Sequence, residues 1–140
     1  MEKKTHILVV DDEQSILQML RKTLELEGFA ITVAVNGNSA LALLAEQAPD
    51  LVLLDIRMPG LNGYQVLERI RESSNVPVIM LTAVREQTAA ERSLGLGADD
   101  YITKPFITPV LIARIRAKLR RARGELRHTD DQIANMDSPS

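Results

Sequence analysis

The chain of 140 residues contains no cysteine and no hydrophobic stretch long enough to cross a membrane. The lack of cysteine excludes disulfide bonds, thiolate metal sites and thiol catalysis. The apolar run near the amino terminus, ILVV at residues 7–10, stops at two aspartates and is too short for a signal peptide. We therefore expect a cytoplasmic protein that has no contact with a membrane.

The sequence also lacks an excess of either charge, because 17 basic and 19 acidic residues leave a net charge of −2. This balance provides no general attraction to nucleic acid or to an anionic membrane. The chain has neither a P-loop nor a GxGxxG motif, so a nucleotide-binding enzyme has no motif support. Its length suits one domain, expected at residues 1–123, while the polar segment 124–140 is expected to be a linker or a disordered tail.

Short apolar runs alternate with amphipathic helical patterns along the whole chain. Such runs are typical of strands that are covered on both faces. Strands are expected at residues 7–10, 31–35, 50–55, 77–82 and 101–103. The helical patterns that follow each run predict an α/β fold: a five-stranded parallel doubly wound sheet, flavodoxin-like with order 2-1-3-4-5, with helices on both faces.

The ends and buried faces of the helices follow from residue spacing and from residues that start or stop a helix. The first helix is expected at 14–27 and the fourth at about 86–94. Thr108 and Pro109 are expected to open the last helix as its N-cap and N1 residues. The side chains expected to face the core in the second and last helices are Leu41, Leu44, Ala45, Leu111, Ile112, Ile115 and Leu119.

Polar side chains stand at the carboxyl ends of four of the five expected strands. They are Asp11 and Asp12 after the first strand, Asp55 on the third, Thr82 on the fourth, and Lys104, followed by Pro105, after the fifth. In a doubly wound sheet these four strand ends border a single crevice. We therefore expect groups that are far apart in the sequence to converge there.

Three carboxylates in one crevice repel one another, by roughly 1 kcal/mol per pair in water and about 4 kcal/mol at a protein surface when they lie about 4 Å apart. Protonation of one carboxylate or a bound divalent cation relieves this repulsion. Oxygen ligands without histidine or cysteine favour a hard ion such as Mg²⁺, for which Mn²⁺ could substitute. Asp12 and Asp55 are expected to be direct ligands, with Asp11 acting through water and the backbone carbonyl of Arg57 completing the set.

A magnesium site with a lysine and a hydroxyl beside it is suited to phosphoryl transfer. The cation and Lys104 would draw charge from the transferring group, and Thr82 would donate a hydrogen bond to one of its oxygens. Asp55 is then a carboxylate nucleophile. Each residue also has an ordinary interpretation: Asp12 as a helix N-cap, Thr82 as a strand-end hydroxyl, and Lys104 as a solvated surface lysine.

Four segments carry a resemblance to a known family: ILVVDDE, DLVLLDIRMPGLNGYQVLERIR, PVIMLTA and GADDYITKPF. They closely resemble the receiver domain of two-component response regulators. The resemblance implies that Asp55 accepts a phosphoryl group from a phosphohistidine of a sensor histidine kinase. It also implies acidic Mg²⁺ ligands at Asp11 and Asp12, phosphate contacts from Thr82, Ala83 and Lys104, and a cis peptide bond before Pro105.

The resemblance further implies a switch. Thr82 would move toward the phosphate, and Tyr101 would rotate inward into the space that Thr82 leaves. The alternative is that Tyr101 is a half-buried aromatic residue on an edge strand. Phosphorylation would favour the active arrangement through contacts that are better there than in the resting one. Such a protein is not an ordinary enzyme, because it catalyses only its own phosphorylation and dephosphorylation.

The ending KPF…LIARIRAKLRR is similar to the subfamily whose receivers are joined to a winged-helix DNA-binding domain. Those receivers form homodimers through ion pairs on the fourth helix, fifth strand and fifth helix. The candidates here are Arg92, Asp99, Asp100, Arg114, Arg116 and Arg121. Val110 stands where that subfamily usually has glutamate, so weaker pairing by Arg92 is expected. The basic run 114–127 is expected to serve this face and not to contact nucleic acid directly.

Competing functions remain open from the residues. A Mg²⁺-dependent phosphatase on the same kind of sheet would need a general acid, commonly an aspartate two residues after the nucleophile, where this chain has Arg57. A degenerate receiver that only binds proteins would not need the intact set of acids, hydroxyl and lysine. A phosphorylation switch uses the whole set, either to control transcription through an absent DNA-binding domain or as a stand-alone receiver that acts on a protein partner.

Overall fold

The computed structural model describes residues 3–124, in which strands and helices alternate. The strands are β1 (His6–Val10), β2 (Ala30–Ala34), β3 (Leu51–Leu54), β4 (Val78–Thr82) and β5 (Asp100–Thr103). The helices are α1 (Gln14–Leu26), α2 (Gly37–Gln47), α3 (Gly63–Ser73), α4 (Gln87–Gly95) and α5 (Thr108–Ala122). All strand pairs are parallel and follow the order β2-β1-β3-β4-β5, which confirms the predicted flavodoxin-like sheet.

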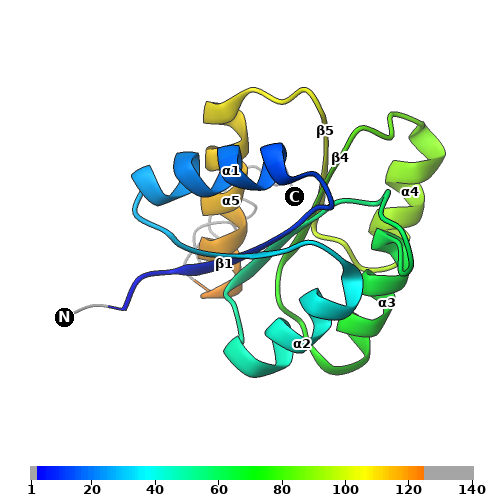
Figure 1. The fold of residues 1–140 in the computed structure, drawn as a ribbon, viewed down its shortest axis with the longest axis horizontal. Coiled ribbons are helices and arrows are strands. Elements are labelled where there is room, and N and C mark those ends of the chain that lie inside the picture. Colours follow the sequence, from blue (N-terminus) through cyan, green and yellow to red (C-terminus); the bar gives the residue numbers. More distant parts are fainter. Residues whose placement is uncertain (1–2, 125–140) are drawn as a thin grey trace, which may run out of the picture.

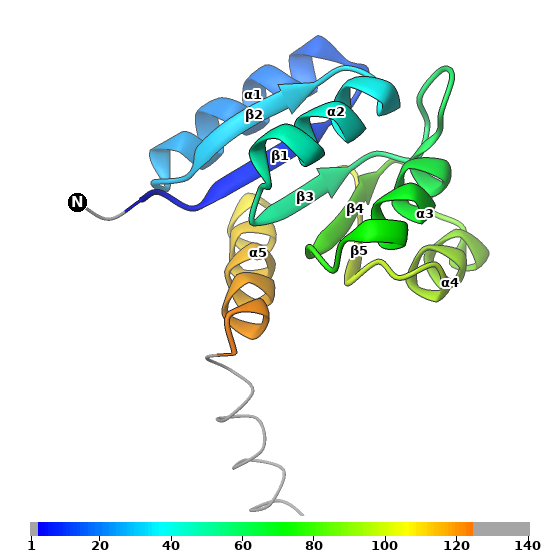
Figure 2. The ribbon, with the colours of Figure 1, turned by 90° about the horizontal axis from the view of Figure 1, so that it is seen from below.

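The helices cover both faces of the sheet, as predicted. α1 and α5 lie on one side, and α2, α3 and α4 lie on the other (Figure 1). A view from below shows the twisted sheet running from β2 at one edge to β5 at the other (Figure 2). Because every strand points the same way, all five carboxyl ends meet at one edge of the sheet.

Alternate residues of β1 show how the sheet divides the core. Ile7 and Val9 pack with the residues of α1 and α5, whereas Leu8 and Val10 pack with those of α2 and α3. Ile7 is completely buried and the other three are 1% exposed. Burial of one such side chain stabilises the fold by about 1.5–3 kcal/mol. The central strands are therefore a rigid support for the polar residues at their ends.

The start of α5 differs from the prediction. The N-cap residue is Ile107, and Thr108 is already the first residue of the helix. No side chain makes a capping hydrogen bond at this end. Pro109 lies in the first turn, where its missing N–H costs nothing because N–H groups there have no partner within the helix.

The inward face of α2 was also predicted incorrectly at one position. Ala45 is exposed, whereas Leu43 packs partly buried against the core together with Leu41 and Leu44. Ala40 is buried in the same helix. Ala45 lies five positions after Ala40, and at 3.6 residues per turn this spacing turns Ala45 away from the core. In α5, Leu111, Ile115 and Leu119 are buried as predicted, and Ile112 is partly buried.

Element boundaries differ from those predicted by about one residue. β3 ends at Leu54, so that Asp55 is the first residue after the strand instead of its last. The predicted linker or tail at residues 124–140 lies outside the described residues, except for Gly124. Within residues 3–124, no helix is both long enough and apolar enough to cross a membrane.

Candidate functional site

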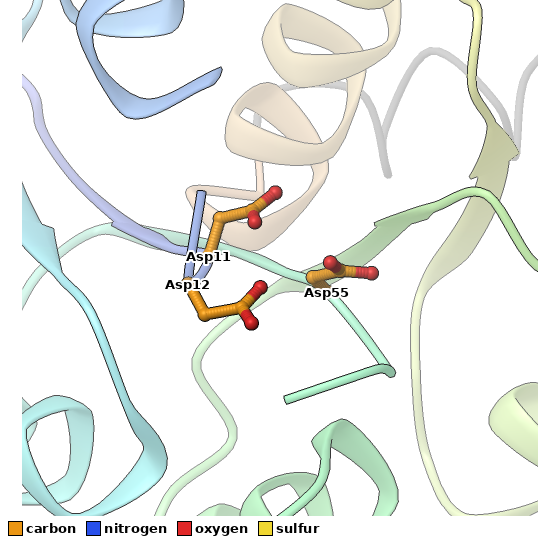
Figure 3. A group of neighbouring side chains, drawn as sticks. All are labelled: Asp11, Asp12 and Asp55. Atoms are coloured by element: carbon orange, nitrogen blue, oxygen red, sulfur yellow. The ribbon is translucent and has the colours of Figure 1, made fainter. Parts of the chain in front are cut away.

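Three aspartates meet at the carboxyl edge of the sheet. Asp11 and Asp12 directly follow β1, and Asp55 directly follows β3, the strand paired with β1 (Figure 3). One carboxylate oxygen from each lies within 4.8 Å of the other two. Asp11 and Asp55 are buried, while Asp12 is exposed to solvent. The predicted convergence of these acids is therefore present, with one of them at the opening of the site.

Lys104, the residue after β5, joins this cluster. Its Nζ lies 2.6 Å from Asp11 Oδ2 and 3.6 Å from Asp55 Oδ2. Its side chain is only 13% exposed. Burial acts to lower the pKa of Lys104, but the hydrogen bond to Asp11 and the charge of Asp55 together raise that pKa above its ordinary value. Lys104 is consequently a charged member of the cluster, which excludes its interpretation as a solvated surface lysine.

The Asp55 carboxyl is buried and incompletely satisfied. Burial raises its pKa above the ordinary value, and the nearby Thr82 hydroxyl and Lys104 ammonium oppose that rise. Its Oδ1 atom is buried without a hydrogen-bond partner in the described part of the chain. A buried acceptor without a partner costs about 1–3 kcal/mol. This atom is therefore available to a ligand that supplies positive charge.

The donor set fits a hard cation. All three candidate ligands are carboxylate oxygens, which Mg²⁺ prefers, and the exposed position of Asp12 leaves room for water ligands. Asp11 is already engaged, since its Oδ1 accepts a hydrogen bond from the Glu13 backbone N–H and its Oδ2 accepts one from Lys104. Direct binding of a cation by Asp12 and Asp55, with Asp11 acting through water, stays a prediction. The carbonyl of Arg57 stays a predicted ligand.

The ordinary interpretation of Asp12 does not hold. The N-cap of α1 is Glu13, and no side chain makes a capping hydrogen bond there. Thr82 is the last residue of β4 and is completely buried, and its Oγ1 accepts a long hydrogen bond of 3.4 Å from the Val84 backbone N–H. Ala83 between them is exposed. The peptide bond between Lys104 and Pro105 is cis, as the resemblance implies.

The loop after Asp55 is held by two features at the start of α3. Asn62 and Gln65 form a capping box, with side chain–backbone hydrogen bonds of 2.9 and 3.0 Å in both directions. Gly63 lies directly on the backbone of Asp55, because a Cβ at this position would lie 2.2 Å from the Asp55 carbonyl oxygen. Only glycine permits this approach. The Arg-Met-Pro-Gly turn after Asp55 therefore returns the chain tightly to the site.

The chain matches the model of the response regulator receiver domain over residues 7–116. It belongs to this family. The probable transcriptional regulator ycf27 of Guillardia theta is 48% identical over 121 residues, which cover 86% of this chain and 48% of the relative. The phosphate regulon transcriptional regulatory protein PhoB of Rhizobium meliloti (strain 1021) is 44% identical over 126 residues, with coverage of 88% and 56%. This receiver chain thus spans about half the length of these curated relatives.

Solved structures agree with this assignment. A CheY-like response regulator receiver domain protein from Methanospirillum hungatei JF-1 superposes with a TM-score of 0.83 at 31% identity, covering 88% of this chain and 99% of that one. The BeF3-activated N-terminal receiver domain of RstA from Klebsiella pneumoniae has a TM-score of 0.80 at 33% identity, with coverage of 82% and 98%.

In this receiver domain, Tyr101 on β5 points toward the loop after β4. Its hydroxyl donates a hydrogen bond to the backbone carbonyl of Val84, two residues beyond Thr82. Its side chain is partly buried and packs against the core cluster under α3 and α4. Burial raises the pKa of Tyr101. Tyr101 is therefore a half-buried residue of the edge strand that is bonded to the segment carrying Thr82.

The residues proposed for a dimer face mostly have partners within the receiver. Asp99 Oδ2 lies 3.0 Å from Arg71 and accepts the Val78 backbone N–H, and Asp100 lies 3.3 Å from Arg114. Arg116 pairs at 3.0 Å with Glu27 beyond the end of α1. Arg92 and Arg121 are exposed. Their role in a dimer stays a prediction.

Two features of the receiver were not predicted from the sequence. One is a groove of about 470 Å³ beside Lys104, lined mainly by apolar side chains of α1 and of the loop between β5 and α5, among them Ile16, Met19 and Phe106. The other is the contact of Arg92 with the ring of Tyr64. Ile16 and Met19 are apolar residues of α1 that line the groove, and Met19 is 39% exposed. The Arg92 contact joins residues 28 positions apart, and no local pattern indicates it.

Proposed function

We propose that this receiver is a phosphorylation-dependent switch whose phosphoacceptor is Asp55. The observation that carries the proposal is the buried Asp55 carboxyl, with an unpaired Oδ1, beside the Lys104 ammonium at 3.6 Å. The carboxyl stands at the end of a rigid buried strand, and a tight turn leads away from it. A nucleophile must be held in this way while a donor approaches from outside.

The transfer itself needs few groups from this chain. A carboxylate oxygen of Asp55 attacks the phosphorus of a phosphohistidine, the phosphorus–nitrogen bond breaks, and the released imidazole takes up a proton. Lys104 neutralises charge on the phosphoryl oxygens, and Thr82 and the backbone at Ala83 donate hydrogen bonds to them. A bound Mg²⁺, or Mn²⁺, supplies charge neutralisation at the site formed by Asp11, Asp12, Asp55 and the Arg57 carbonyl.

Phosphorylation is read out through Thr82 and Tyr101. A phosphoryl group on Asp55 attracts the Thr82 hydroxyl, and the chain from Thr82 to Val84 follows. The hydrogen bond from Tyr101 to the Val84 carbonyl supports this coupling, because it ties the ring to the same segment. The phosphoryl group shifts the equilibrium only by as much as it binds one arrangement better than the other.

The partner that supplies the phosphoryl group is a sensor histidine kinase. Its phosphohistidine must reach Asp55 through the opening at the carboxyl edge of the sheet. The apolar groove of Ile16, Met19 and Phe106 lies next to Lys104 and suits one helix of such a partner. We assign this groove to the kinase, and the reaction to the cytoplasm.

The output is control of transcription through a dimer. The transcriptional regulators ycf27 and PhoB support this proposal, and their greater length leaves room for a DNA-binding domain. Two phosphorylated receivers pair through α4, β5 and α5, and this segment does not itself bind nucleic acid. A stand-alone receiver that acts on a protein partner is the alternative. Phosphorylation-dependent dimerisation in sedimentation experiments favours the first, and a persistent monomer favours the second.

The decisive test is covalent labelling. The chain is incubated with acetyl phosphate and Mg²⁺, and its intact mass is measured with peptide mapping. We expect one phosphoryl group on Asp55, no label in Asp55→Asn, and no label when the cation is removed by chelation. Label that persists in Asp55→Asn contradicts the proposal. Repeated hydrolysis of phosphate esters, many per protein molecule, would instead support a phosphatase.

A further inference from the structure

α4 is held against the rest of the domain by few contacts of its own. Only Ala89 and Ser93 are buried in its nine residues, and no side chain caps its first turn. Small side chains bury little apolar surface, so their packing contributes little to holding the helix. A cavity of about 410 Å³ separates α4 from the loops after β3 and β4. The position of this helix must therefore depend on contacts outside its buried face.

One such contact is the stacking of Arg92 on Tyr64. The guanidinium carbon of Arg92 lies 4.1 Å from the centre of the Tyr64 ring, and both residues line the cavity. Tyr64 is only 9% exposed, which holds its ring in place, whereas Arg92 is exposed to solvent, so the contact is a cation–π interaction of the weaker kind that is found at exposed sites. Within residues 3–124 Arg92 forms no ion pair, since the ion pairs there involve other residues.

Tyr64 is in turn fixed relative to the phosphoacceptor. It follows Gly63, whose backbone N–H donates a 2.7 Å hydrogen bond to the carbonyl of Ile56. Gly63 also lies so close to the Asp55 carbonyl that a Cβ at this position would be 2.2 Å from the carbonyl oxygen. We therefore expect a displacement of the backbone at Asp55 to be passed through Gly63 to Tyr64.

We propose that Tyr64 and Arg92 are a positioning pair that ties α4 to the Asp55 loop by a route separate from Thr82 and Tyr101. The two routes meet at the cavity, because Val84, whose carbonyl accepts the Tyr101 hydroxyl, also lines it. With the stack formed, α4 stays close to Val84, and the Tyr101 hydrogen bond is favoured. Without the stack, α4 moves outward more often, and the arrangement with this hydrogen bond becomes less populated.

The test measures local opening of α4 in the unphosphorylated chain by hydrogen exchange. We expect the amides of α4 to exchange about 2- to 5-fold faster in Arg92→Gln and in Tyr64→Leu than in the unmodified chain. Tyr64→Phe keeps the ring and should exchange as the unmodified chain does. Arg92→Lys keeps the charge but loses the planar stack, so its α4 amides should exchange at a rate between those of the unmodified chain and Arg92→Gln. The matched control is Arg120→Gln, which removes an exposed arginine from α5.

A double-variant cycle separates a direct contact from general loosening. If the stack is the contact that holds α4, Arg92→Gln combined with Tyr64→Leu exchanges no faster than the more perturbed single variant. Effects that multiply in the double variant, or equal acceleration in α1 and α4, overturn the proposal. So does an α4 that exchanges at the unmodified rate in both single variants.

A second readout connects the pair to the proposed function, on which this part of the inference rests. Labelling of Asp55 by acetyl phosphate and Mg²⁺ should be at least about twofold slower in Tyr64→Leu and unchanged in Tyr64→Phe. Exchange in α4 needs no phosphodonor. Failure of Asp55 labelling in the unmodified chain would thus contradict the proposed function, whereas unchanged exchange would contradict the positioning pair.

Discussion

Lys104 Nζ lies between two buried carboxylates, 2.6 Å from Asp11 Oδ2 and 3.6 Å from Asp55 Oδ2. One ammonium group therefore compensates two negative charges that repel each other. The shorter distance to Asp11 shows that Asp11 is the stronger partner of the lysine and that Asp55 is less completely paired. This inequality matters for the proposed function, because it leaves Asp55 the less engaged of the two carboxylates and so the more available to accept a phosphoryl group.

Lys104→Met should destabilise the metal-free protein by about 1–3 kcal/mol, because it leaves Asp11 and Asp55 buried without their shared cation. Mg²⁺ should restore part of this loss, since it replaces the missing positive charge. Urea denaturation in chelator and in Mg²⁺ measures both effects. Lys22→Met, which removes an exposed lysine from α1, is the control and should change stability little. Equal midpoints for the two variants in chelator would contradict the role given to Lys104.

Asp55→Asn should change the pH dependence of stability in the metal-free protein. Burial raises the pKa of Asp55 in the folded state, so the folded chain holds this proton to higher pH than the unfolded chain does. The contribution of Asp55 to the free energy of unfolding therefore falls as pH rises from the ordinary aspartate pKa through the raised one. The variant lacks this fall and should be the more stable protein at neutral pH.

Thermal unfolding in chelator from about pH 4 to pH 8 measures the difference, and a gain of about 1 kcal/mol would raise Tm by roughly 2–8 °C. Glu25→Gln, an exposed position on α1, is the control and should leave the pH profile unchanged. A difference between Asp55→Asn and the unmodified chain that is constant over the whole pH range would exclude this explanation.

Gly63→Ala should disturb both the fold and the site. The added Cβ would lie 2.2 Å from the Asp55 carbonyl oxygen and 2.6 Å from Ile56 Cα, which are backbone atoms that cannot move aside easily. We expect a loss of about 1–3 kcal/mol in stability and slower labelling of Asp55. Gly95→Ala is the opposite case, because its Cβ would meet no atom within 4 Å at the end of α4.

Gly95→Ala should therefore stabilise the protein slightly, by up to about 1 kcal/mol. Chemical denaturation of both variants, with labelling by acetyl phosphate, separates the two positions. If Gly63→Ala is as stable and as readily labelled as Gly95→Ala, the close approach of Gly63 to the Asp55 carbonyl contributes neither to stability nor to the reactivity of Asp55.

The fold and the acidic cluster could be predicted because they depend on patterns that are local in the sequence. Each strand is a short apolar run, and the parallel topology alone brings Asp11, Asp55 and Lys104 to one edge. The errors have local causes too. Thr108 has the right chemistry for an N-cap, but the helix begins at that residue, so its side chain has no capping hydrogen bond.

Contacts between exposed side chains could not be predicted in this way. Asp99 and Asp100 were assigned to a dimer face from the resemblance to the winged-helix subfamily, and their pairs with Arg71 and Arg114 within this chain were not predicted. A charged residue on a surface has several partners within reach, and differences of well under about 1 kcal/mol choose among them. The sequence shows which residues are charged, but it does not show the distances that decide which of them form ion pairs.

The substitution Val110→Glu should strengthen a phosphorylation-dependent dimer only modestly. Val110 is 43% exposed near the start of α5, where glutamate would offer a partner to Arg92 of a second copy. An exposed ion pair contributes about 0.2–1 kcal/mol, and Arg92 must first leave the ring of Tyr64. We expect the dimer dissociation constant to fall by no more than about fivefold at low salt.

Sedimentation velocity with beryllofluoride and Mg²⁺, at about 0.05 M and about 0.5 M salt, should show a gain in dimer affinity that disappears at the higher salt concentration. The same gain in a chain that also carries Arg92→Gln would show that Arg92 is not the partner of the new glutamate.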